Sequence, residues 1–322
     1  MSRIRAAVVG VGYLGRFHAQ KYAALPGCEL VGVVDPRREA REAVAAELSV
    51  PAMDDWHVLL GNVDAVSVVT HTPAHFEIAA AFLKAGAHVL VEKPMTETLA
   101  QARELIALAT AQRRVLQVGH LERFNAAILA AETKLRAPRF LECHRLAPFR
   151  ERGTDVNVVL DLMIHDIDIV QSIVRSPLVS VDAVGTPVFS SEIDIANARL
   201  RFANGCVANT TASRVSLKTE RKLRIFQDDA YFSIDLQQKI LTVIRKRAPG
   251  EAAGPLPVTI EEQNLEQGDA LKAEIESFLD CIATGKAPIV GGEDGLRALE
   301  TALRITEQVR NSAAQAATGA AP

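Results

Sequence analysis

Two groups of residues in this chain of 322 amino acids could carry out chemistry, and the first is a glycine pattern near the N-terminus. Gly10, Gly12 and Gly15 follow an apolar run and precede the helix-like segment 16–25. In that context the first glycine allows a tight turn, the second lets a pyrophosphate approach the backbone, and the third lets helix and strand pack closely. Because a helix N-terminus favours phosphates, the pattern predicts a dinucleotide site.

Asp35 supports this prediction. It ends the apolar run 30–34, twenty residues after Gly15, where an acidic side chain accepts hydrogen bonds from the adenosine ribose hydroxyls. A carboxylate there repels a 2′-phosphate, which favours NAD over NADP. Arg37 and Arg38 weaken the preference, because an arginine at this place can hold a 2′-phosphate. The alternative for both arginines is a solvated first helical turn or stacking on adenine.

The second group is an acid–base pair, Asp161 and His165, four residues apart in an apolar, helix-like stretch. At this spacing the two side chains share one face of a helix. The carboxylate could orient the imidazole and keep it basic, and oxidation of an alcohol needs a base for the hydroxyl proton. Taken alone, such a pair is more often structural.

Lys93 is a further candidate for chemistry. It follows an apolar run and precedes Pro94, which restricts the local backbone. At the carboxyl end of a strand near a nicotinamide, its ammonium group could donate to the reacting oxygen and stabilise developing alkoxide charge. The alternative is an ordinary surface lysine.

The first 120 residues alternate between apolar runs and helix-like segments. This order predicts a doubly wound parallel sheet of the Rossmann type, with ligands at the carboxyl ends of its strands. The predicted strands are 6–9, 30–34, 65–69, 88–91 and 115–118, and the predicted helices are 16–25, 37–48, 74–85 and 97–112.

From Arg139 onward the runs alternate apolar and polar residues with few helices between them, which predicts a C-terminal α+β domain with a large open, mainly antiparallel sheet. The helix-like stretch 158–174 could cover one face of that sheet. The other face could pair with another subunit, so we expect a homodimer or homotetramer. The predicted domains are 1–122 for the dinucleotide and 123–311 for substrate and oligomerisation, followed by a disordered tail, 312–322.

Bulk composition narrows the class of protein. A net charge of −3 and 48% hydrophobic residues predict a soluble globular protein rather than a binder of nucleic acid or membranes. The chain has no signal-peptide pattern and no apolar run that could span a bilayer, so we expect a cytoplasmic protein. Its four cysteines are far apart, which predicts reduced thiols and no metal site.

Several of these motifs occur together in a known family. The chain resembles the Gfo/Idh/MocA family of nicotinamide-dependent oxidoreductases through Gly10-x-Gly12-x-x-Gly15 with His18, Thr72-Pro73-x-His75, Glu92-Lys93-Pro94 and Asp161-x-x-x-His165. The resemblance covers almost the whole chain. It implies a Rossmann domain, a C-terminal domain whose open sheet serves oligomerisation, and catalysis by Lys93 and His165, with His165 as general acid/base and Asp161 supporting it. The implied cofactor residues are Gly10, Gly12, Tyr13, Leu14, Gly15, Asp35, Arg37, Thr70, His71, Pro73, His75, Glu92, Lys93 and Arg123.

A narrower resemblance concerns the substrate. Segments 118–125, 161–168, 213–216 and 224–227 are similar to family members that oxidise the 3-hydroxyl of UDP-linked N-acetylhexosamines, although Ala126 stands where a proline is expected. This implies oxidation of UDP-N-acetylglucosamine to a 3-keto sugar nucleotide, for later transamination to a 3-amino sugar of lipid A. The implied substrate contacts are Lys93, Asn125, Arg145, Asp161 and His165. Candidates for the UDP diphosphate are Arg145, Arg150, Arg214 and Arg224, each of which could equally be ordinary strand-surface charge.

Two other functions stay open at this point. One is the same chemistry on a free polyol or monosaccharide, such as inositol or glucose. The other is a non-catalytic regulator that binds a nicotinamide cofactor. The joint presence of Lys93, Asp161 and His165 argues against a regulator.

Overall fold

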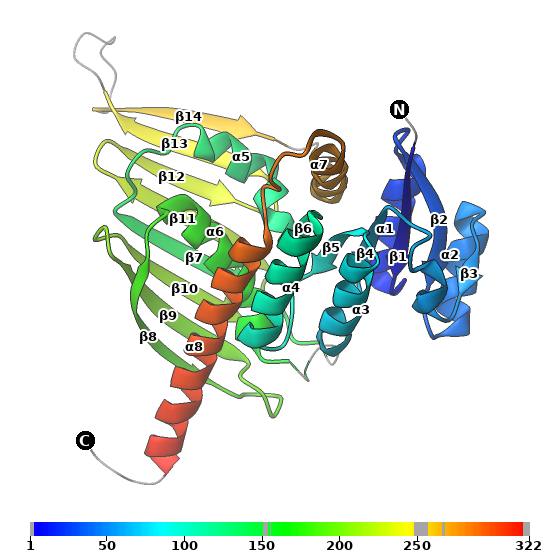
Figure 1. The fold of residues 1–322 in the computed structure, drawn as a ribbon. Helices are drawn as coiled ribbons and strands as arrows, with labels where there is room; N and C mark the ends of the chain where they lie inside the picture. The colour runs from blue at the N-terminus through cyan, green and yellow to red at the C-terminus, as the bar shows by residue number, and fades with distance from the viewer. Residues whose placement is uncertain (1–2, 151–153, 155, 248–256, 266–267, 318–322) are drawn as a thin grey trace. The chain divides into compact units, whose positions relative to one another are not determined.

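The computed structural model describes residues 3–150, 154, 156–247, 257–265 and 268–317, and these form two compact units (Figure 1). The first unit contains the chain up to residue 124 together with 269–296, and the second contains 125–268 and the chain from 297 onward. Within the described residues, no helix is both long and apolar enough to cross a membrane.

A six-stranded parallel sheet forms the centre of the first unit, with strand order β3-β2-β1-β4-β5-β6. This is the strand order of a dinucleotide-binding Rossmann fold, which confirms the predicted fold class. The sequence pattern did not predict β3, which has only two residues and no apolar run of its own. The strands are β1 (Ile4–Val9), β2 (Cys28–Val34), β3 (Ala52–Met53), β4 (Ala65–Val68), β5 (His88–Glu92) and β6 (Leu116–Gly119).

The helices of the first unit include one from far along the chain. Helix α7 packs Leu271, Ile275 and Phe278 into the same core as Tyr22 and Leu25. The predicted boundary after residue 122 would assign this helix to the other domain, whereas its buried side chains pack in the first unit. The helices are α1 (Tyr13–Ala24), α2 (Arg38–Leu48), α3 (Thr72–Lys84), α4 (Leu99–Gln112) and α7 (Ala270–Thr284), with 3₁₀ turns η1 (Trp56–Leu59) and η2 (Leu121–Phe124).

An eight-stranded sheet forms the second unit, in the order β14-β13-β12-β11-β7-β10-β9-β8. All neighbouring pairs are antiparallel except β7 and β10, which confirms a large, mainly antiparallel sheet. The strands are β7 (Phe140–Leu146), β8 (Leu178–Thr186), β9 (Ile195–Phe202), β10 (Val207–Ser213), β11 (Glu220–Gln227), β12 (Ala230–Asp235), β13 (Ile240–Lys246) and β14 (Val258–Asn264).

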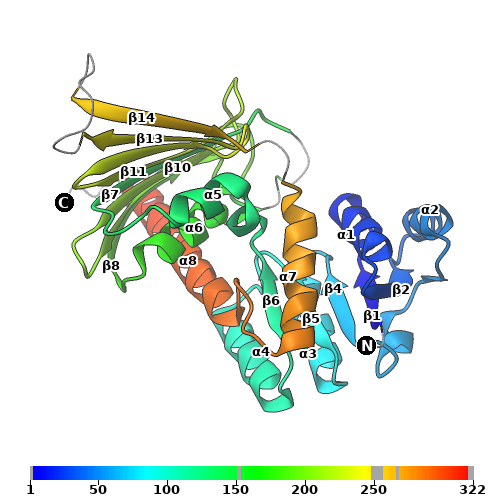
Figure 2. The same cartoon turned by 90° about the horizontal axis from the view of Figure 1, so that it is seen from above.

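Helices lie on one side of this sheet (Figure 2). They are α5 (Ala126–Glu132), α6 (Ile164–Val174) and the part of α8 (Gly292–Ala317) that belongs to the second unit. Along β7, Leu141 and Cys143 are buried in the core, while Glu142 and His144 on the opposite face are only half-buried. The sheet therefore has a covered face and an open one.

Two helix ends differ from expectation. The stretch predicted as one helix, 158–174, begins with a π-helical turn η3 (Val159–Met163) before α6. Helix α8 continues to Ala317, into the tail predicted to be disordered, and residues 318–322 of that tail lie outside the described residues.

Candidate functional site

The glycine loop after β1 requires glycine at two of its three positions. Gly10 has a φ of 88°, and a side chain there would place its Cβ 2.5 Å from the carbonyl oxygen of Val69. A Cβ on Gly15 would overlap the carbonyl oxygen of Gly10. A Cβ on Gly12 would meet only the guanidinium of Arg37, at 3.2 Å, so steric packing alone does not require glycine there.

The loop leads into the N-terminus of α1, which fits a diphosphate. Gly12 is the N-cap residue, no side chain in the described chain caps it, and the first turn carries no acidic residue. The main-chain N–H groups of that turn point out of the helix end, and the helix dipole favours an anion beside them. Tyr13 at the first helical position is exposed, and Leu14 is half-buried.

Asp35, directly after β2, holds the glycine loop in place by hydrogen bonding. Its Oδ2 accepts the main-chain N–H of Val11 at 3.0 Å, and its Oδ1 accepts the main-chain N–H and the Nε of Arg37 at 2.9 and 3.1 Å. Burial raises the pKa of Asp35, but the hydrogen bonds and charge of Arg37 outweigh it and hold the pKa below its usual value. Arg37 therefore pairs with Asp35, whereas Arg38 pairs with the exposed Glu42.

His75 connects the loops that follow β4 and β5. Its Nδ1 lies 2.9 Å from the carbonyl oxygen of Pro94, and its Nε2 lies 3.0 Å from that of Thr70. Burial lowers the pKa of His75, and the two carbonyl groups oppose that shift only in part. His71 and Pro73, at the exposed start of α3, complete the predicted loop.

Glu92 and Lys93 stand at the carboxyl end of β5. Glu92 Oε2 accepts the main-chain N–H of Lys93 at 3.2 Å, and Oε1 lies 3.3 Å from Nε2 of His18. Burial raises the pKa of Glu92, but the hydrogen bond and charge of His18, and then the charge of Lys93, hold it below its usual value. A buried negative charge thus lies beside the half-buried Lys93, whose peptide bond to Pro94 is cis.

Two residues after β6 line the same edge of the sheet. Arg123 Nη2 donates to the carbonyl oxygen of Ile289 at 3.3 Å. His120 is buried, and burial together with the nearby positive charge of Lys93 lowers its pKa to about 3. His120 is therefore neutral at physiological pH. The sequence analysis gave His120 no role, although its place directly after a parallel strand was a usable signal.

The predicted acid–base pair lies in the second unit. Asp161 is in the π-helical turn and His165 is the second residue of α6; both are half-buried, whereas Met163 and Ile164 between them are fully buried. The side chain of Asn157 accepts the N–H groups of Val159 and Leu160 and so caps the turn. π-Helical turns inside helices are frequent at functional sites. A direct contact between Asp161 and His165 stays a prediction.

Arg145 and Asn125 are held within the second unit. The buried guanidinium of Arg145 binds the buried carboxylate of Asp166 through Nε and Nη2, the latter at 2.9 Å. The amide of Asn125 accepts the N–H of Ala127 at the start of α5 and donates to the carbonyl oxygen of Leu236. These contacts position the two side chains, and their roles toward a substrate stay predictions.

The other candidate arginines differ in their surroundings. Arg214 is buried, and its Nε donates to Asp194 at 2.7 Å. Arg224 binds Glu142 at 2.9 Å on the open face of the sheet. Arg150, by contrast, is exposed. Arg214 therefore stabilises the fold locally, and Arg150 is the more accessible candidate for a diphosphate.

Comparison with known proteins gives consistent findings over most of the chain. Residues 4–120 match the Gfo/Idh/MocA oxidoreductase family, NAD-binding Rossmann fold, and residues 149–316 match its C-terminal alpha/beta domain. The chain is 42% identical over 306 residues to UDP-N-acetylglucosamine 3-dehydrogenase of Acidithiobacillus ferrooxidans, covering 95% of this chain and 97% of that protein. A solved structure of that enzyme has a TM-score of 0.91 and 41% identity, covering 97% and 99% of the two chains. Scyllo-inositol 2-dehydrogenase of Bacillus subtilis is 27% identical over 330 residues, covering 96% and 95%.

Proposed function

Because the chain belongs to the Gfo/Idh/MocA family of oxidoreductases, we propose that it is an NAD-dependent dehydrogenase of the C3 hydroxyl of UDP-N-acetylglucosamine. Its product is then a 3-keto sugar nucleotide, which an aminotransferase converts to a 3-amino sugar for lipid A. The observation that carries the substrate assignment is the 42% identity, over 95% of the chain, to an enzyme of that name. The similarity to an inositol dehydrogenase is weaker, at 27%.

The residues of the first unit fit NAD. The α1 N-terminus offers main-chain donors for the diphosphate, Gly12 leaves room for its approach, and Asp35 offers carboxylate oxygens for the ribose hydroxyls. Arg37 is held against that carboxylate, where its plane can cover the adenine. Bound NAD supplies the hydride acceptor, and the chain supplies the proton transfer and charge stabilisation.

The roles of the chain's own groups follow from their chemistry. His165 removes the proton of the C3 hydroxyl, and Asp161 keeps its imidazole oriented and basic. Lys93 donates to the same oxygen and stabilises its negative charge as the carbonyl forms. Glu92 fixes the main chain at Lys93 and supplies the countercharge.

We also infer that the chain forms a homodimer or homotetramer through the open face of the second sheet. Adjacent strands place a row of apolar side chains across that face: Phe140, Phe226, Tyr231, Ile244 and Ile260. The rings of Phe226 and Tyr231 stack at 4.8 Å, and Ile260 is 59% exposed. Burying such a row favours association. The four cysteines are free and buried, which supports the inferred cytoplasmic location.

The test is incubation of the purified protein with NAD and UDP-N-acetylglucosamine, an amine donor and a sugar-nucleotide aminotransferase that traps the ketone. The expected result is an amino sugar nucleotide that depends on NAD. No product, with an active coupling enzyme and with NAD binding retained, would contradict the substrate assignment.

Binding of UDP alone separates the two sugar alternatives, because an enzyme of free sugars has no site for a nucleotide diphosphate. A protein that binds NAD and UDP but forms no product with any sugar nucleotide would instead be a regulator.

A further inference from the structure

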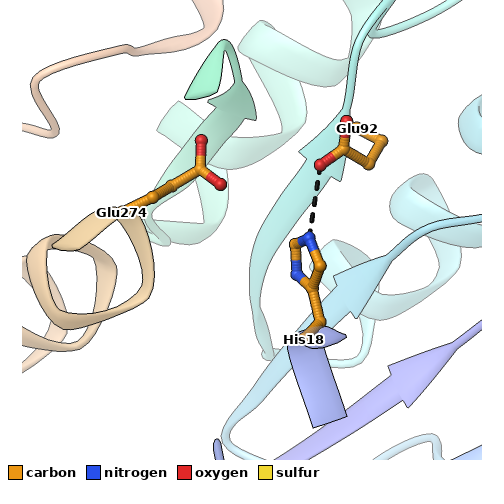
Figure 3. A group of neighbouring side chains, drawn as sticks. All are labelled: His18, Glu92 and Glu274. Atoms are coloured by element: carbon orange, nitrogen blue, oxygen red, sulfur yellow. Dashed lines mark ion pairs between the residues drawn. The ribbon is translucent and has the colours of Figure 1, made fainter. Parts of the chain in front are cut away.

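Three ionisable side chains form a buried cluster inside the first unit (Figure 3). His18 comes from α1, Glu92 from the end of β5 and Glu274 from α7, and one ligand atom of each lies within 4.8 Å of those of the other two. His18 and Glu274 have no exposed surface, and Glu92 is 7% exposed.

Glu274 is the member of this cluster whose burial is unexplained. Among the described residues, neither of its carboxylate oxygens has a hydrogen-bond partner. Its carboxylate points toward the space between His18 and Glu92 (Figure 3). Buried polar groups normally have hydrogen-bond partners. Burial, and then the negative charge of Glu92, raise the pKa of Glu274 well above its usual value. Two carboxyl groups therefore converge on one imidazole.

His18 is oriented as a ligand to a metal ion commonly is. Its Nδ1 lies 3.2 Å from Oγ of Ser67, which in turn lies 2.9 Å from the hydroxyl of Tyr22. When Nδ1 donates to Ser67 and a metal ion displaces the proton of Nε2, the lone pair of Nε2 faces the two carboxyl groups. A hydrogen bond from the second ring nitrogen of this kind fixes the tautomer and orientation of metal-binding histidines.

We propose that His18, Glu92 and Glu274 bind a divalent transition-metal cation of the Zn²⁺ type. His18 Nε2, one oxygen of Glu92 and one oxygen of Glu274 supply three donor atoms. Zinc sites with three histidine or carboxylate ligands take a water molecule at the fourth tetrahedral position. Two carboxylates balance the double positive charge, and the imidazole favours zinc over magnesium or calcium.

The cluster needs only a small movement to close on the ion. Donor atoms bound tetrahedrally at about 2.0–2.2 Å from a zinc ion lie roughly 3.4 Å from one another. The three ligand atoms now lie within 4.8 Å of one another, so they must move slightly closer. Rotation about the side-chain bonds of Glu274 would bring its oxygens inward. The bound ion would then join α7 to α1 and β5. Sequence analysis predicted no metal site, because the three ligands come from distant segments.

The test uses the full chain, stripped with a chelator and titrated with ZnCl₂. The expected result is one zinc per chain by elemental analysis, with a melting temperature that rises with zinc concentration. Glu274→Gln should lower the affinity about 100-fold or more. Ser67→Ala keeps all three ligands and should lower it about 10- to 100-fold. Glu276→Gln is the matched control, because Glu276 lies on the same helix and is exposed.

Three outcomes would overturn the proposal. Zinc uptake that is equal in the parent protein and Glu274→Gln would place the ion elsewhere. Absence of uptake by the parent protein would mean that protons neutralise the cluster. If Glu274→Gln fails to fold, Ser67→Ala decides, and an unchanged zinc affinity in that variant contradicts the site. None of these readouts depends on turnover, so the proposed enzymatic function is tested separately.

Discussion

The imidazole of His75 lies 2.9 Å from the carbonyl oxygen of Pro94, and this contact ties the loop that carries Lys93 to the helix that follows β4. The other ring nitrogen reaches the carbonyl oxygen of Thr70. A single buried side chain thus holds two of the loops at the cofactor edge of the sheet. His75 acts on this edge as a positioning residue.

His75→Ala should destabilise the first unit by about 2–4 kcal/mol, because it leaves a cavity and removes the single N–H donor that the neutral imidazole offers to the two carbonyl groups. Urea unfolding followed by tryptophan fluorescence measures this directly, since Trp56 is the only tryptophan and lies in the first unit. His71→Ala, at an exposed position of the same loop, should change stability by no more than about 0.5 kcal/mol. Equal effects of the two variants would contradict the bridging role.

His165→Ala should lower kcat about 100- to 10,000-fold in the coupled assay, because it removes the base for the hydroxyl proton. Lys93→Ala should also lower kcat strongly, because it removes the donor to the developing alkoxide. Both variants should retain NAD affinity in calorimetric titration. Near-normal turnover in either variant would show that its residue does not have the assigned role.

The Arg145–Asp166 pair should behave as a buried ion pair. Asp166→Asn removes the countercharge of a guanidinium that is only 3% exposed, so it should cost about 3–5 kcal/mol in thermal unfolding followed by calorimetry. The double variant Arg145→Met, Asp166→Leu should recover most of that loss, because the orphaned charge disappears. Additive losses in the double variant would refute this account.

The lowered pKa of Asp194 predicts that the stability of the second unit depends on pH. Burial raises its pKa, but hydrogen bonds from Ser190 and Arg214 outweigh burial and lower it far below the usual value. A carboxyl group whose pKa is lowered by folding stabilises the folded state. This stabilisation has its full value above the pKa of the unfolded chain, near 4, and is lost as the pH falls below it. The difference in melting temperature between the parent protein and Asp194→Asn should therefore be constant from pH 7 to 5 and shrink below pH 4. A difference that grows on acidification would contradict the sign.

Local patterns predicted most of the fold. The five apolar runs of the first half became β1, β2, β4, β5 and β6 because buried parallel strands need continuous apolar sequence. After Arg139, apolar and polar residues alternate along the chain, and this pattern predicted the second sheet. It did so because one face of that sheet is buried and the other is not. Local patterns did not predict that α7 belongs to the first unit. An amphipathic helix shows which face is buried, but its sequence does not show which unit buries it.

The candidate site was predictable to the same extent. Gly10, Gly15 and Asp35 have the backbone conformation, close packing and loop contacts that the pattern requires. The long-range neighbours were not predictable, because Asp166 lies 21 positions from Arg145 and Glu274 lies 182 positions from Glu92 in the sequence. Which side chains meet at such separations depends on the topology of the chain.

The return of α7 to the first unit has a consequence for synthesis on the ribosome. Leu271, Ile275 and Phe278 complete a core that begins with β1, so the nucleotide-binding half cannot finish folding when its last strand has been translated. It must wait until the chain has been made to beyond residue 284, after nearly the whole second sheet. A nascent chain stopped near residue 124 would expose the apolar surface around Tyr22, and a gene fragment cut there would encode an incomplete domain.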